Sequence, residues 1–134
     1  MATYGYGIDL PFTASGDLGS YQYRFVKAAS LAKRVDLANG ASNPLPLGVL
    51  QNDPDSLDSA QVRIYGETKV WYSSSTAINY GAFLMSGSAG GAETAGTVAG
   101  SSVQGISLED AAPAGSGYIS MLLWPANSIV AGLK

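Results

Sequence analysis

The side chains most able to do chemistry in this chain are carboxylates, because its 134 residues include neither histidine nor cysteine. The lack of both excludes Ser-His and Cys-His nucleophile systems and nearly every catalytic zinc site. Asp53, Asp55 and Asp58 lie together in the segment NDPDSLD, where oxygen ligands could hold calcium. The EF-hand spacing is missing, however, and Asn and Asp beside proline are typical of turns. We therefore predict a turn here and no metal site.

The remaining candidate carboxylates show no spacing that would make a catalytic pair. Glu67, Glu93, Glu109 and Asp110 could in principle supply a glycosidase-type pair, but nothing in the sequence pairs them. The glycine-rich segment SGSAGGAETAGTVAGSS lacks the phosphate-binding patterns that precede a helix, so we expect a hairpin loop there. The sequence predicts no catalytic residue, no cofactor and no enzyme.

Composition limits the classes of partner. Charged residues form 13% of the chain, about half of the usual share of roughly 25%, and the net charge is −3. A nucleic-acid-binding protein would need a clustered basic face, and a membrane span would need about 18 consecutive apolar residues. Neither is present in the sequence, and the N-terminus has no secretory signal pattern. A surface this poor in charge suits a chain that packs among neighbouring subunits.

From residue 47 onward the pattern is typical of β-strands. In AQVRIYGETKVWY the apolar residues alternate with polar ones, so Val62, Ile64, Val70 and Tyr72 can share one face. Gly66 separates two strand-like pieces and predicts a bulge or a tight turn. Short strands between turn signals continue to the C-terminal region. They predict an all-β fold, either a small β-barrel or a β-sandwich, with glycine-rich loops.

The sequence divides into three parts around this β domain. Residues 1–22 show no sustained period and predict an extended N-terminal arm, residues 23–124 the β domain, and residues 125–134 a C-terminal tail. Residues 25–38 fit either an amphipathic helix or two short strands, and periodicity cannot decide between these for so short a segment.

Two segments of the β domain resemble each other. Aligning residues 47–64 with 104–121 places Gly48 on Gly105, and a β-branched residue follows each glycine. Both copies then pass through an acidic, proline-containing turn into an alternating strand. The pattern predicts two similar strand-turn-strand units, although any two hairpins share some of these features.

The order of these segments resembles that of the small phage capsid cement proteins, also called head decoration proteins. The resemblance rests on PLGVLQNDP, AQVRIYGETKV, INYGAFLMSGSAGG and GTVAGSSVQGISLEDAAPAGSGYISMLL, and it covers roughly residues 23–124. It implies a compact β-barrel or sandwich made in the host cytoplasm that binds the outer surface of the assembled phage head. It also implies a homotrimer at local three-fold positions that clamps neighbouring major capsid subunits.

A second function class remains open on the sequence alone. A small carbohydrate- or ligand-binding β module of a phage tail or a surface adhesin would also have strands rich in Trp and Tyr. Its aromatic side chains would stack on sugars instead of on protein subunits.

Eight residues are candidates for contact with the capsid or with another subunit. The aromatic residues of the arm are too apolar for a solvated tail. The one basic cluster of the sequence consists of Lys27, Lys33 and Arg34, and it either is solvated or pairs with acidic capsid residues. Adjacent residues of a strand face opposite sides, so at least one of Trp71 and Tyr72 lies outside the core in a regular strand. The candidates are Tyr4, Tyr6, Phe12, Tyr21, Lys33, Arg34, Trp71 and Tyr72.

Overall fold

The computed structural model of the chain describes residues 6–39, 46–74, 77–94, 102–111, 115–123 and 129–130. Within these ranges every regular element is a β-strand, apart from the single 3-10 turn η1 (Ser88–Gly90), so the predicted all-β class is confirmed. None of the described residues form a helix long and apolar enough to cross a membrane.

The strands follow one another along the chain with short connections. In chain order they are β1 (Gly7–Ala14), β2 (Phe25–Ala28), β3 (Arg34–Leu37), β4 (Pro46–Leu50), β5 (Ser59–Ser74), β6 (Phe83–Ser86), β7 (Ala92–Thr94), β8 (Ser102–Val103), β9 (Gly105–Ser107), β10 (Gly115–Leu123) and β11 (Ile129–Val130).

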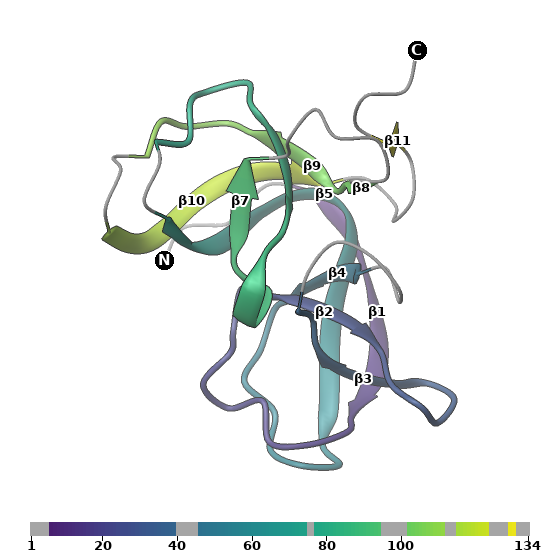
Figure 1. Cartoon of the computed structure of the whole chain (residues 1–134). Coiled ribbons are helices and arrows are strands. Elements are labelled where there is room, and N and C mark those ends of the chain that lie inside the picture. The colour runs from purple at the N-terminus through teal and green to yellow at the C-terminus, as the bar shows by residue number, and fades with distance from the viewer. Residues whose placement is uncertain are drawn as a thin grey trace.

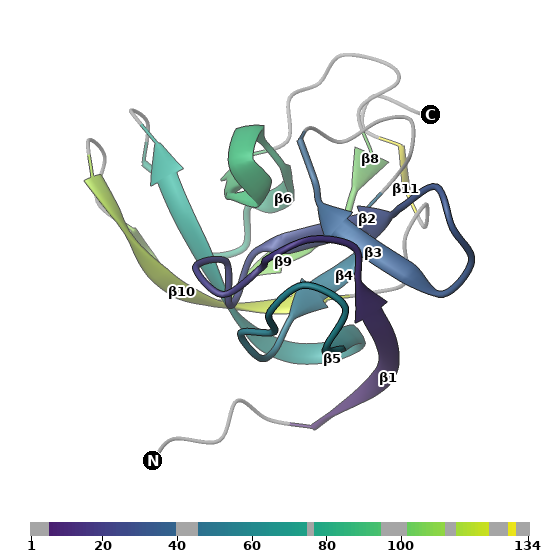
Figure 2. The same cartoon turned by 90° about the horizontal axis from the view of Figure 1, so that it is seen from below.

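The long strand β5 belongs to two rings of strands. In the first ring the order is β1-β3-β2-β4-β5, and the antiparallel pairing of β1 with β5 closes it. In the second ring the order is β5-β10-β9-β6-β7, closed by a parallel bridge between Tyr72 and Ala92. Figure 1 shows the first ring below and the second above, with β5 running through both. Seen from below, β5 and β10 curve side by side (Figure 2).

Gly66 is the point where β5 passes from one ring to the other. Its φ of +112° lies in a region that favours glycine, and a Cβ atom there would overlap the carbonyl oxygen of Tyr6. Gly66 pairs with Gly7 of β1 on one side and with Leu123 of β10 on the other. The irregularity that the sequence predicts at Gly66 is therefore a bend inside one continuous strand.

Two hydrophobic clusters lie on opposite faces of the β2–β4 pair. Phe25 and Val26 are neighbours on β2 and are both fully buried, yet Phe25 belongs to cluster 1 and Val26 to cluster 2. On β4, likewise, Val49 belongs to cluster 1 and Leu50 to cluster 2. Successive strand side chains point to opposite faces, so β2 and β4 form a layer that is buried on both sides. Cluster 1 contains Phe25, Ala38, Val49, Val70, Ile78, Leu84, Ala92, Ala111, Ile119, Met121 and Leu123. Cluster 2 contains Ala14, Leu18, Val26, Val35, Leu50, Ala60 and Val62.

Residues 25–38, which the sequence left open, form the antiparallel hairpin of β2 and β3. Burial of β2 on both faces explains the ambiguity, because adjacent buried residues do not give the two-residue period of a half-exposed strand. Part of the predicted arm, residues 1–22, also has regular structure. Residues Gly7–Ala14 form β1, which pairs with β5 along its length and with β3 at its end, so this part of the predicted arm belongs to the sheet.

The two glycines of the predicted repeat occupy equivalent places. A Cβ atom on Gly48 would overlap the carbonyl oxygen of Arg63 on β5, and one on Gly105 would overlap that of Leu122 on β10. In both units a short strand therefore lies unusually close to the backbone of the antiparallel strand that follows it. The registers differ, since Val49 pairs with Arg63 whereas the equivalent Ile106 pairs with Leu122 instead of Ser120.

Replacing Gly48 by alanine is expected to destabilise the fold strongly, because the backbones of β4 and β5 would have to separate. We expect the free energy of unfolding to fall by about 3 kcal/mol, the upper range for overpacking. Gly16→Ala is the matched control, since a Cβ atom there would meet nothing within 4 Å, and its effect should stay within about 0.5 kcal/mol. Urea denaturation of both variants measures the difference, and equal midpoints would contradict the close approach.

Candidate interaction surface

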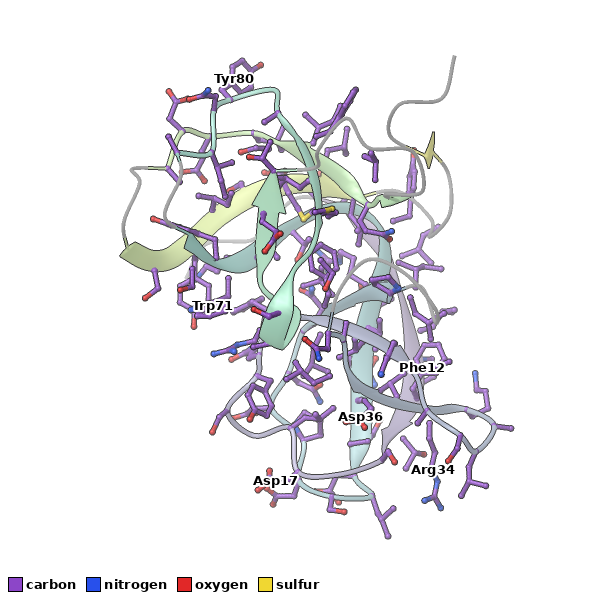
Figure 3. The ribbon with its side chains drawn as sticks, viewed as in Figure 1. Phe12, Asp17, Arg34, Asp36, Trp71 and Tyr80 are labelled. Carbon is purple, nitrogen blue, oxygen red and sulfur yellow. The ribbon has the colours of Figure 1, made fainter. Side chains whose placement is uncertain are left out.

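The structure does not gather the eight predicted contact residues into one place. Phe12 and Lys33 lie together on the first ring, where the Lys33 Nζ atom is 4.7 Å from the centre of the Phe12 ring. Arg34 is adjacent, because it pairs with Thr13 of β1. Figure 3 shows Phe12 and Arg34 in the lower half of the molecule, apart from Trp71. Tyr6 is 95% exposed just before β1, and Tyr4 lies outside the described residues.

Trp71 and Tyr72 point to opposite faces of β5, as strand geometry requires. Tyr72 is partly buried against cluster 1. Trp71 lies on the outer face, where the Arg24 guanidinium carbon is 3.7 Å from the centre of a ring of the indole. The backbone of Gly91 also contacts this side chain, because a Cβ atom on Gly91 would lie 2.7 Å from the Trp71 Cζ3 atom. The indole of Trp71 is thus partly covered by the chain itself.

The Arg24 side chain connects the segment before β2, from Tyr21 to Arg24, to the second ring. Its guanidinium also lies 5.0 Å from the centre of the Tyr21 ring, and its Nη1 atom donates a hydrogen bond of 3.2 Å to the carbonyl oxygen of Ala89. The backbone holds the segment in position, because the Trp71 amide donates to the Tyr23 carbonyl at 2.8 Å. The segment from Tyr21 to Arg24 therefore lies along the outer face of β5.

A second cation lies between aromatic rings on this face. The Nζ atom of Lys69 is 5.0 Å from the centre of the Tyr23 ring and 5.1 Å from that of Tyr118. The two tyrosine rings meet edge to face with their centres 5.9 Å apart. Tyr118 is the cross-strand partner of Trp71 and is 52% exposed. The Lys69 and Arg24 contacts therefore belong to one continuous surface.

We call these six residues the cation–aromatic surface: Tyr21, Tyr23, Arg24, Lys69, Trp71 and Tyr118. Only Tyr21 and Trp71 among them were predicted from the sequence as contact residues. The alternation of Lys69 and Trp71 on β5 indicates a shared face, but the contribution of Tyr118 depends on the register between β5 and β10, which the sequence does not reveal.

The charge on this surface is positive, because its two cations outnumber Glu67, the carboxylate that β5 places on the same face two residues before Lys69. Among the described residues no carboxylate oxygen lies within 4 Å of the Arg24 guanidinium. The ion pair that the described residues do form is elsewhere, between Arg63 of β5 and Asp9 of β1, at 2.7 Å. Arg24 thus carries a charge balanced by aromatic faces and a carbonyl oxygen instead of by a carboxylate.

The candidate carboxylates of the sequence hold loops in place. Glu109 Oε2 accepts a hydrogen bond from the Ser120 amide at 2.8 Å, and Asp110 Oδ1 accepts one from the Tyr80 amide at 2.7 Å. The NDPDSLD segment folds as the predicted turn, with the Asp58 amide donating to the Asp55 carbonyl at 3.0 Å. In the described part of the chain, no group of three or more acidic residues is placed to hold a metal ion.

Two apolar patches are also exposed. Phe83, Ile106 and Leu122 form a row across β6, β9 and β10, because Ile106 pairs with both of the others. Phe83 is 48% exposed and Leu122 is 39% exposed. The second patch runs along β1, where Ile8 pairs with the half-exposed Tyr65 of β5. The first patch borders Glu67, the cross-strand partner of Leu122, and Asp9 follows Ile8 in the second.

Comparison with known proteins shows a similarity of fold. No protein-family model matches the chain. No curated protein matches it either. A similar solved structure is the crystal structure of the head fibre gp8.5 N base in bacteriophage phi29, with a TM-score of 0.62 and 19% sequence identity. The similarity covers 92% of this chain and 99% of that chain. At this identity it establishes a shared fold.

The stacking of Arg24 on Trp71 is expected to stabilise the fold measurably. Arg24→Met keeps the aliphatic stem and removes the charge, so the free energy of unfolding should fall by about 1–2 kcal/mol, as for a partly desolvated cation–π pair. The control is Lys27→Met on β2, with an expected effect within about 0.5 kcal/mol. A double-mutant cycle with Trp71→Leu, followed by urea denaturation, should give a coupling energy of about 1 kcal/mol. A coupling energy near zero would refute the stacking.

Proposed function

We propose that this chain is a structural protein of a phage virion that decorates the outside of the head. The observation that carries this proposal is the shared fold with the base of a phage head fibre, which extends over 92% of this chain and 99% of the other. The order of sequence segments that resembles the capsid cement proteins supports the same assignment independently. Both lines of support concern proteins of the phage head.

In this proposal the protein also cements neighbouring major capsid subunits, as a homotrimer at local three-fold positions. These finer features rest on the sequence resemblance. The physical mechanism is mass action, because a ligand that binds the assembled lattice and not the free subunits stabilises the lattice. At a free concentration one hundred times the Kd, each site would contribute about 2.7 kcal/mol. Many sites on one head act together, so modest affinity per site suffices.

We also propose that the chain is not an enzyme. The sequence supplies neither histidine nor cysteine. Glu109 and Asp110, the carboxylates that lie next to each other in the sequence, accept backbone hydrogen bonds from Ser120 and Tyr80. These contacts give both side chains a role in fixing the loops that they join.

The carbohydrate-binding alternative would have to use tyrosines. Stacking on a sugar needs an open ring face, and the indole of Trp71 is covered in part by Arg24 and Gly91. Among the aromatic side chains of the described ranges, those that are more than half exposed are Tyr6, Tyr80 and Tyr118. Tyr80 and Trp71 lie well apart in Figure 3.

Purified heads that lack this protein provide the direct test. Added protein is expected to co-sediment with the heads until the sites saturate, and to raise the temperature at which the heads break open. It should not bind unassembled capsid subunits, because the proposed site forms across junctions between them. Absence of both binding and stabilisation would refute the proposal. Binding to host-surface polysaccharide instead of to heads would favour the alternative function.

A further inference from the structure

We propose that the cation–aromatic surface on β5 and β10 is the face that docks onto the head, and that its partner there is an acidic patch of the protein shell. This inference rests on the proposed function and names the face and the chemistry of the contact.

The charge of the surface fits an acidic partner. Two cations, Arg24 and Lys69, lie on a face where β5 contributes one carboxylate, Glu67, in a chain whose net charge is −3. In the described ranges no carboxylate is within 4 Å of Arg24. Its guanidinium forms one hydrogen bond with the Ala89 carbonyl, which leaves further N–H donors for an incoming carboxylate.

The side chains of the surface are those that anchor protein interfaces. Trp, Tyr and Arg dominate the residues whose truncation most weakens binding. Here Arg24 is fixed between Tyr21 and Trp71, and Lys69 lies against Tyr23 and Tyr118. Cations already held in position lose less side-chain freedom on binding, which favours affinity. Tyr118, at 52% exposure, offers an apolar contact beside both cations.

The other exposed surfaces fit an acidic protein partner less well. On the β2–β3 hairpin Lys27 is the cross-strand partner of Asp36, which opposes its charge. The other cations of this hairpin, Lys33 and Arg34, have fewer aromatic contacts than Arg24 and Lys69, since Lys33 lies over the single ring of Phe12. The apolar patch along β1 includes Pro11, which has no N–H to donate, and a register shift between Ile8 and Asp9. Both features oppose the addition of another strand. The Phe83 row carries no cation, and its Leu122 has the carboxylate Glu67 as cross-strand partner.

Two single variants test this surface without changing the Arg24 contact. Lys69→Gln removes one cation, and Tyr118→Ser removes the most exposed aromatic side chain of the cation–aromatic surface. Tyr118→Ser is expected to weaken co-sedimentation with heads about tenfold, the effect of losing an interface anchor. Lys69→Gln should weaken it and also reduce its dependence on salt between about 0.05 M and 0.5 M, because screening acts on the charge contact. Circular dichroism and the urea midpoint check that each variant is folded.

The matched control is Lys27→Gln on β2, which removes the same charge from a lysine whose cross-strand partner is Asp36. Its affinity for heads should stay within about twofold of the wild type, as for a residue outside the contact. Folded Lys69→Gln and Tyr118→Ser proteins that bind heads as the wild type does would overturn the inference and leave the proposed function intact. Wild-type binding that is insensitive to salt would refute the inference that the partner surface is acidic. Failure of the wild type to bind heads at all would refute the proposed function itself.

Discussion

The bend of β5 at Gly66 is the constraint on which both halves of the molecule depend. One strand can close two rings only if its backbone changes direction where β1 ends on one side and β10 ends on the other. The positive φ of Gly66 and its contact with the Tyr6 carbonyl allow both pairings at the same residue. Before the bend, β5 supplies Val62 to cluster 2, and after it Val70 to cluster 1. The two cores are therefore joined through one continuous strand.

The cation–aromatic surface follows from this arrangement. Lys69, Trp71 and Tyr118 come from β5 and β10 of the second ring, whereas the segment from Tyr21 to Arg24 leads into β2 of the first. Their contact requires both rings to be folded and correctly placed around β5. A binding face built in this way is present only in the complete fold. The stability of the connection between the rings and the affinity of the surface should consequently depend on the same contacts.

Much of the fold could be predicted from the sequence, because alternation and turn residues mark strands wherever one face is exposed. The role of Gly48 and Gly105 could be predicted as well, since a glycine inside an apolar strand indicates close backbone approach. β1 was missed because Pro11 and a largely exposed face hide its alternation. Arg24 and Tyr118 were missed because their contacts join residues far apart in the chain. Pairing register and long-range packing fix such contacts, and neither can be read from local patterns.

Electron microscopy of heads carrying the bound protein would locate it, because one reconstruction gives its position, its symmetry and the face that touches the shell. We predict density for the two-ring fold on the outer surface of the head at local three-fold positions. We also predict that the outer face of β5 and β10 is turned toward the capsid subunits. A bare outer surface, or density confined to the tail, would contradict the account.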